Sequence, residues 1–256
     1  MALEYRGVSK DFVTNPDNPL TAVRDINFRV EEGEFVSIVG PSGCGKSTIL
    51  SMTAGLYQPT RGEVFVSDER VVGPNAHVGF MLQKDLLLPW RSIVANVEFG
   101  LEARGVGKAE RRERAMKELR HCHLAGFENH FPYQLSGGMR QRAALARTLA
   151  IDPEIILLDE PFSALDAQTK LLLQNSFGGT IAAAGKTTLL ITHDLAEAVL
   201  MSDRILVLSE RPGTIVAEIR IDLPHRDQPL KRRVLPEVSR YAAELFGHLK
   251  LEEKAL

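Results

Sequence analysis

Apolar and polar residues follow two kinds of pattern along the chain, and together these patterns predict strands that alternate with helices. At residues 26–30 the apolar positions recur with a period of two, which is typical of a half-buried strand. Short apolar runs predict further strands, and longer stretches with charged outer faces predict helices. The other predicted strands are 35–39, a short pair within 62–72, 78–82, 155–158, 187–192 and 204–208. The predicted helices are 49–56, 86–105, 109–123, 139–150, one from residue 168 onward, 194–201 and 236–250.

Strands separated by helices imply a mostly parallel sheet with helices on both faces, which is an α/β fold. We predict a helical insertion at about residues 85–132, between two halves of this sheet. Residues 1–224 are expected to form one domain, and residues 225–256 a linker followed by a short C-terminal helix. Gly178 and Gly179 fall inside the helix predicted from residue 168. Because each glycine costs roughly 1 kcal/mol relative to alanine inside a helix, we expect that helix to break there.

The bulk composition narrows the class of protein. The chain has 256 residues, 44% of them apolar, which suits one large domain with a short appendage. Its net charge of −2 gives no reason to expect a nucleic acid partner. Two distant cysteines, Cys44 and Cys122, indicate a reducing cytoplasm rather than a disulfide framework. The N-terminal residues resemble no secretory signal, and the apolar runs are too short to span a bilayer, so we expect work at a membrane to require a partner.

A glycine-rich loop follows the strand predicted at residues 35–39. Its sequence, GPSGCGKST, satisfies G-x-x-x-x-G-K-[ST] between a strand and a helix, which is the context of a phosphate-binding loop. Backbone amides can surround a phosphate there, Lys46 offers a charge to the β- and γ-phosphates, and Ser47 offers an oxygen to Mg²⁺. We interpret Cys44 as a space-filling residue rather than a reactive thiol. The predicted nucleotide-binding residues of this loop are Gly40, Pro41, Ser42, Gly43, Cys44, Gly45, Lys46, Ser47 and Thr48.

Two adjacent carboxylates, Asp159 and Glu160, end the buried run IILL. Burying an unpaired carboxylate costs folding free energy, so this pair is not expected to lie in the core. The carboxyl ends of parallel strands face a ligand crevice instead. Asp159 is therefore a candidate Mg²⁺ ligand, and Glu160 a candidate general base for an attacking water. The alternative is a pair of solvated acids at a strand end, which the upstream phosphate loop makes the weaker interpretation.

A second anion-binding motif decides between families of ATPase and GTPase. LSGGM precedes an alanine-rich helix, so Ser136, Gly137 and Gly138 form another helix N-terminus suited to a phosphate. Together with Gln83, the run IILLDEP, the segment SALD at 163–166 and His193, this pattern resembles the ATP-binding cassette (ABC) family. The resemblance covers roughly residues 3–223. It implies a phosphate-loop NTPase cassette, with a mostly parallel core, an N-terminal antiparallel β region and a helical subdomain.

The resemblance also implies roles for individual residues and a dimeric assembly. In the family, two cassettes bind head to tail, and each ATP lies between one phosphate loop and the other subunit's LSGG segment. On this chain, Ser136, Gly137 and Gly138 would therefore contact the γ-phosphate in trans. The other implied roles are Mg²⁺ and water contact for Gln83, γ-phosphate contact for His193, dimer contact for Asp166 and adenine stacking for Phe12.

Residues 77–83, the following LLLPWRSIVANV and the later LSERPGTIVAEI resemble cassettes of nitrate, sulfonate, taurine and related importers. That branch implies a transmembrane permease as direct partner, an extracytoplasmic solute-binding protein as indirect partner, and a position on the cytoplasmic face of the plasma membrane. Nitrate, aliphatic sulfonates and thiamine-precursor pyrimidines stay open as cargo. A soluble ABC ATPase of DNA repair or translation is the alternative. A phosphate-loop kinase or GTPase would leave LSGGM, Asp166 and His193 unexplained.

Two short segments keep alternative interpretations. The apolar residues Leu86, Leu87, Leu88 and Trp90 belong either to the core or to a partner surface. The basic triplet 231–233 faces either anionic lipid or solvent. His121, Cys122 and His123 are not expected to share a metal ion, because consecutive residues of a helix point in different directions.

Overall fold

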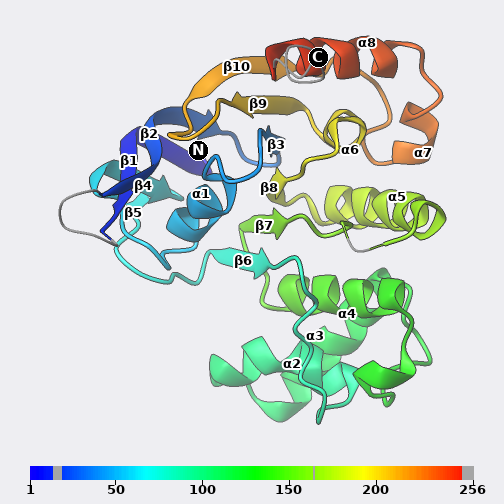
Figure 1. Cartoon of the computed structure of the whole chain (residues 1–256). Helices are drawn as coiled ribbons and strands as arrows, with labels where there is room; N and C mark the ends of the chain where they lie inside the picture. The colour runs from blue at the N-terminus through cyan, green and yellow to red at the C-terminus, as the bar shows by residue number, and fades with distance from the viewer. Residues whose placement is uncertain (14–18, 164, 250–256) are drawn as a thin grey trace.

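A six-stranded sheet forms the centre of the structure, a computed structural model that describes residues 1–13, 19–163 and 165–249 (Figure 1). Its strand order is β10-β9-β3-β8-β7-β6, and all neighbouring strands are parallel except β10, which runs antiparallel to β9. The strands are β3 (Phe35–Val39), β6 (Val78–Met81), β7 (Ile155–Asp159), β8 (Thr187–Ile191), β9 (Arg204–Leu208) and β10 (Ile215–Arg220). The predicted α/β class with a mostly parallel core is confirmed.

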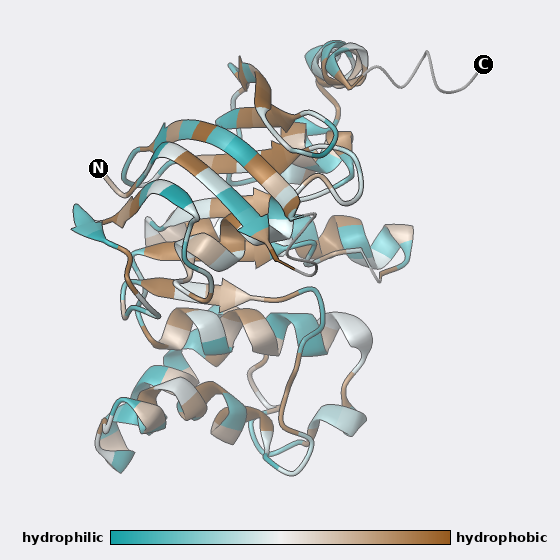
Figure 2. Ribbon diagram, turned by 60° about the vertical axis from the view of Figure 1, so that its left-hand side comes forward, coloured by the Kyte–Doolittle hydropathy of each residue, from teal (hydrophilic) through white to brown (hydrophobic). Residues whose placement is uncertain are grey.

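A second, antiparallel sheet of order β2-β1-β4-β5 covers one face of the central sheet. Figure 2 shows hydrophilic and hydrophobic residues alternating along its long strands, as expected of a sheet with one face in the core. Its strands are β1 (Leu3–Phe12), β2 (Leu20–Val30), β4 (Arg61–Val66) and β5 (Glu69–Arg70). Alternate side chains of the buried central strands enter two separate cores: Val36 and Ile38 face the antiparallel sheet, whereas Phe35 and Val39 face the helices on the other side.

The helices cover both faces of the central sheet and form the predicted insertion. Helix α1 packs in the core beneath the antiparallel sheet, and the other long helices contribute to the opposite core. The helices are α1 (Lys46–Thr53), α2 (Ile93–Ala103), α3 (Lys108–His121), α4 (Gly137–Ala150), α5 (Ala167–Ala184), α6 (Leu195–Met201), α7 (Pro229–Arg232) and α8 (Glu237–His248). In Figure 1, α2, α3 and α4 form a layer beyond the edge strand β6. No helix in the described ranges is both long enough and apolar enough to cross a membrane.

The first helix of the insertion begins later than predicted. The helix expected at 86–105 starts at Ile93, where Ser92 acts as N-cap by accepting a hydrogen bond from the amide of Ala95. The residues before it form a loop around the buried Asn96. The Asn96 amide accepts a hydrogen bond from the backbone N–H of Leu88 and donates to the Leu88 and Arg91 carbonyls. These bonds satisfy backbone groups that a helix would otherwise pair, so the loop is stable without helical geometry.

The predicted break at Gly178 and Gly179 is wrong, because α5 is continuous from Ala167 to Ala184. The structure supplies a packing reason for the first glycine. A Cβ atom at Gly178 would lie 2.8 Å from Cδ of Pro229 and 3.2 Å from the carbonyl oxygen of Arg226. The glycine therefore lets the C-terminal segment approach the helix closely, which offsets its unfavourable helix propensity.

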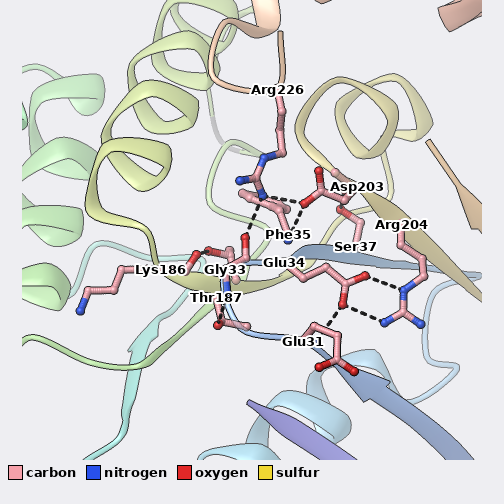
Figure 3. A network of polar contacts seen from close by, with 12 residues as sticks. Glu31, Gly33, Glu34, Phe35, Ser37, Lys186, Thr187, Asp203, Arg204 and Arg226 are labelled. Carbon is pink, nitrogen blue, oxygen red and sulfur yellow. Dashed lines mark hydrogen bonds and ion pairs between the residues drawn. The ribbon is translucent and has the colours of Figure 1, made fainter. Parts of the chain in front are cut away.

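The segment that follows β10 is tied to the central sheet at the N-terminal ends of its strands (Figure 3). The Arg226 guanidinium donates to the carboxylate of Asp203, 2.7 Å away, and to the carbonyl of Gly33. The same Asp203 oxygen accepts the amide of Phe35 at the start of β3. Next to this group, Arg204 binds both carboxylate oxygens of Glu34. Because parallel strands share one direction, this network lies at the edge opposite the phosphate loop.

Arg232 faces neither lipid nor solvent, unlike the two basic residues beside it. Its side chain is 1% exposed, whereas Lys231 and Arg233 are exposed. The guanidinium donates to the carbonyls of Val199, Leu200 and Ser202 at the end of α6, and also to the carbonyls of Leu223 and Pro224. The last carbonyls of a helix have no partner within the helix, so Arg232 acts as a cap for α6.

We expect Arg232→Met to lower the free energy of unfolding by about 3 kcal/mol, because several carbonyls lose the buried charged donor that binds them. The control is Arg233→Met, which removes an exposed charge and should change stability by less than about 0.5 kcal/mol. Urea unfolding followed by circular dichroism measures both. Equal stability of the two variants would show that the cap on α6 contributes nothing.

Candidate functional site

The predicted phosphate loop lies between β3 and α1, at the carboxyl end of the central sheet. Gly45 occupies the N-cap of α1 with φ 103°, so the loop backbone turns directly into the helix. Lys46 is 8% exposed, and its Nζ donates to the carbonyls of Gly40 and Pro41 at 2.8 and 2.9 Å. Cys44 is buried beneath the loop, and burial raises the pKa of its thiol, which agrees with a space-filling role.

A hollow of about 320 Å³ opens above this loop. Phe12, Leu20 and Ala22 line it together with the phosphate loop, Glu160 and Arg211. Phe12 makes an edge-to-face contact with Tyr57, with ring centroids 5.4 Å apart. The predicted aromatic residue and the predicted phosphate loop therefore line one hollow, although more than 25 residues separate them in sequence.

The acidic pair lies beside the loop at the carboxyl end of β7. The Ser47 hydroxyl donates to Oδ1 of Asp159 over 3.3 Å. Burial raises the pKa of Asp159, while the bond from Ser47 opposes the shift. Glu160 has a positive φ of 46°, and its amide donates to the carbonyl of Ile191 on the neighbouring strand β8. This backbone turn points the chain away from the strand, so the two adjacent carboxylates occupy different environments.

Two further predicted residues reach this acidic pair from separate elements. His193 follows β8, and its Nδ1 lies 3.2 Å from Oε2 of Glu160. Gln83 follows β6, and its side-chain amide donates to the hydroxyl of Ser163, which in turn donates to the carbonyl of Glu160. The carboxyl ends of β6, β7 and β8 thus bring Gln83, Glu160 and His193 together, as expected for one edge of a parallel sheet.

The LSGGM segment lies apart from this hollow. Ser136 is exposed and acts as N-cap of α4, where its hydroxyl accepts the amide of Met139. Ser136, Gly137 and Gly138 are not among the described residues that line the hollow. One chain therefore carries two helix N-termini suited to phosphate, and only one of them belongs to its own hollow. Asp166 likewise forms the N-cap of α5, accepting the amide of Thr169.

This arrangement agrees with the comparison against known protein families. Residues 23–163, more than half of the chain, match the family model described as ABC transporter.

The chain belongs to the ABC transporter family.

Similar proteins share this cassette over most of its length. An uncharacterised ABC transporter ATP-binding protein of Methanocaldococcus jannaschii is 46% identical over 98% of this chain and 92% of its own. The nitrate import ATP-binding protein of Synechocystis is 41% identical over 99% and 97% of the two chains. A taurine import ATP-binding protein of Yersinia pestis is 46% identical over 80% of each. Among solved structures, a dimeric ATP-binding cassette in a post-hydrolysis state bound to ADP and Pi superposes with a TM-score of 0.74. It is 34% identical and covers 86% of this chain and 98% of its own.

The cassette contains a polar cluster that sequence reasoning missed. Lys170 of α5 lies 2.9 Å from the carboxylate of Asp194 and 2.8 Å from that of Glu197. Gln174 donates to the same Glu197 oxygen. Burial raises the pKa of Glu197, and Lys170 opposes that shift. The cluster joins the start of α5 to the start of α6, directly after His193. A local pattern could not reveal it, because its members come from two helices.

Arg211 is the second residue that sequence reasoning missed. It follows β9 in an exposed loop and lines the hollow together with the phosphate loop. The segment LSERPGTIVAEI resembles the importer branch, but nothing in its residues or spacing indicates that Arg211 lies beside the phosphate loop.

Proposed function

We propose that this cassette is the ATP-hydrolysing subunit of an importer that drives the uptake of a small solute through a separate permease. The observation that carries the proposal is the convergence of Phe12, the phosphate loop and Glu160 on one hollow. The family and the importer relatives support the class of activity. The solute belongs to the nitrate, sulfonate, taurine or thiamine-precursor class.

In this proposal, the hollow binds ATP with its adenine against Phe12 and its phosphates against the loop. Lys46 and the loop amides hold the β- and γ-phosphates. Glu160 accepts a proton from the attacking water, and His193, 3.2 Å away, contacts the γ-phosphate. These assignments place the base and the phosphate contact on neighbouring strands of a rigid sheet, which suits a reaction that depends on positioning.

The polar groups beside the loop fit a Mg²⁺ ion. Ser47 and Asp159 already lie within hydrogen-bonding distance of each other, and Gln83 carries an amide oxygen just after β6, the strand beside β7. All three side chains offer hard oxygen ligands. A cation would also favour the charged form of Asp159, whose pKa burial raises. When bound, Mg²⁺ neutralises charge on the β- and γ-phosphates.

A second copy of the chain completes each site in this proposal. Ser136 is exposed at the N-terminus of α4, with the half-buried Gly137 and the buried Gly138 directly after it, and none of the three lines its own hollow. A head-to-tail dimer would place this helix N-terminus against the partner's γ-phosphate. Asp166, at the exposed N-cap of α5, would support the same contact. The dimeric form of the related solved cassette supports this arrangement.

The loop before α2 is the proposed docking site for the permease. Leu87 is 7% exposed and belongs to the core, whereas Leu86 is 53% and Trp90 72% exposed. Arg147 of α4 donates to the carbonyls of Asp85 and Leu86, so the loop is held in shape by the helix that begins at the LSGGM segment. A permease helix seated on Leu86 and Trp90 would thus contact a loop held by α4, the helix whose N-terminus is proposed to face the partner's ATP.

The remaining partners follow from the importer class. A periplasmic or lipid-anchored solute-binding protein would deliver cargo to the permease without touching the cassette. The cassette would then lie peripherally at the cytoplasmic face of the plasma membrane. No nucleic acid is part of the proposal.

We expect Trp90→Glu to abolish permease-coupled transport while soluble ATPase activity stays within about twofold of the wild type, because Trp90 lies on the surface away from the hollow. The control is Val234→Glu, since Val234 is 80% exposed between α7 and α8. Transport into proteoliposomes and ATPase rate are measured for both. Normal transport by Trp90→Glu would rule out this docking site.

A further inference from the structure

The loop between β9 and β10 has a fixed shape of its own. The amide of Ser209 donates to the carbonyl of Thr214 at 2.9 Å, and the amide of Thr214 donates to the hydroxyl of Ser209 at 3.0 Å. The Ser209 hydroxyl also donates to the carbonyl of Pro212. These hydrogen bonds within six residues make this turn a preorganised element rather than a loose connection.

Gly213 attaches this turn to the nucleotide site. Its amide donates to the carbonyl of Ala22 at 3.0 Å, and its carbonyl accepts the amide of Arg24 at 2.9 Å. A Cβ atom at Gly213 would lie 2.1 Å from the carbonyl oxygen of Cys44, so only glycine allows the turn to pass this close to the phosphate loop. The turn is therefore fixed between Ala22, which lines the hollow together with Phe12, and Cys44, within the phosphate loop.

Arg211 lies two residues before this attachment and lines the hollow. Among the described residues of that lining, Lys46 and Arg211 carry positive charge. Lys46 serves the β- and γ-phosphate end of the site. The Arg211 turn is attached both to Ala22, which lines the hollow with Phe12, and to the phosphate loop. With adenine against Phe12, as in the proposed function, the ribose and α-phosphate of ATP would lie between these two attachments.

We propose that Arg211 is a nucleotide-binding residue that contacts the α-phosphate of ATP and ADP. The proposal rests on the ATP-binding function argued above. A guanidinium presents its donors in a planar fork that matches two phosphate oxygens, and such charge-assisted hydrogen bonds are stronger than neutral ones. Since ADP keeps the α-phosphate, Arg211 stabilises the product complex as much as the substrate complex.

The test measures the affinity of the full-length chain for ATP, ADP and adenosine, by competition with a fluorescent ATP analogue. We expect Arg211→Met to weaken the binding of ATP and of ADP by the same factor, roughly tenfold, and to leave the binding of adenosine unchanged. Arg211→Lys keeps the charge without the fork and should fall between Arg211→Met and the wild type. The matched control is Arg220→Met, which removes an exposed arginine at the far end of β10 and should bind like the wild type.

Each other pattern overturns the proposal. A loss of affinity for ATP alone would show that Arg211 contacts the γ-phosphate. An equal loss of affinity for adenosine would show that it contacts the base. Unchanged affinity in Arg211→Met would remove it from the site while leaving the proposed function intact. A wild-type chain that binds no ATP would refute the proposed function itself. Thermal unfolding of both Arg211 variants, expected to match the wild type because the side chain is exposed, separates lost contact from lost fold.

Discussion

Glu160→Gln is expected to slow ATP hydrolysis by ~10²–10⁴-fold, because glutamine keeps the shape of the side chain but is a far weaker base. Glu160 lies in the hollow beside His193, so the substitution changes the proposed proton acceptor without disturbing the phosphate loop. Binding of ATP should survive, since Lys46 and the loop amides are unchanged. Loss of one negative charge near the γ-phosphate even favours binding.

The same variant should accumulate as a dimer in ATP and return to monomer in ADP. In the head-to-tail arrangement, intact ATP joins the two subunits, and cleavage removes the γ-phosphate that the LSGGM segment contacts. Size-exclusion chromatography with light scattering, run with ATP or ADP in the buffer, measures this directly. Asp159→Asn is the matched comparison, because the neighbouring carboxylate is assigned to Mg²⁺ and its loss should weaken the Mg²⁺-dependent part of binding as well.

Two results would contradict the assignment of Glu160. Hydrolysis at the wild-type rate would remove it from the role of general base. A Glu160→Gln chain that binds ATP tightly yet stays monomeric would count against the ATP-bridged dimer for the isolated subunit.

Ser136→Arg and Lys46→Ala should each reduce ATPase activity by ~10²-fold or more as single variants, because each removes or blocks phosphate donors. An equal mixture of the two should nevertheless recover part of the activity. If Ser136 acts in trans, each mixed dimer has one site damaged twice and one intact site. Random pairing makes half of the dimers mixed, so roughly a quarter of the wild-type activity returns if one intact site turns over alone.

The mixture is compared with each single variant at the same total concentration. Cross-linking gives an independent readout: Ser136→Cys on one chain should react with Ser47→Cys on another chain in ATP but not in its absence. Full activity of both single variants, or no ATP-dependent cross-link, would refute the contact in trans.

Local patterns in the sequence were sufficient for the buried strands and the phosphate loop. Strands β3 and β9 have the bounds that their apolar runs predict, because a strand buried on both faces must be apolar along its length. The phosphate loop is equally local, since its function depends on consecutive backbone amides between one strand and one helix. Motif order along the chain also indicated the family, which the comparisons confirm.

Strands β1 and β10 escaped prediction for two different reasons. β1 changes register between Tyr5 and Val8 and again before Lys10, so its apolar positions do not keep a period of two. β10 is an edge strand, defined mainly by its pairing with β9. A strand whose stability comes from its neighbours leaves a weak signal in its own sequence.

The burial and contacts of Gly178, Trp90, Arg211 and Arg232 were decided by the tertiary structure. Gly178, which disfavours a helix, is tolerated because Pro229 packs against it. One arginine of a basic triplet is buried because the carbonyls of α6 need donors, while its neighbours stay in solvent. Trp90 is exposed although Leu87, three residues earlier, is core. The sequence shows the chemical type of each residue and its spacing from nearby residues. The burial of a side chain and its contact partners depend on distant segments that only folding brings together.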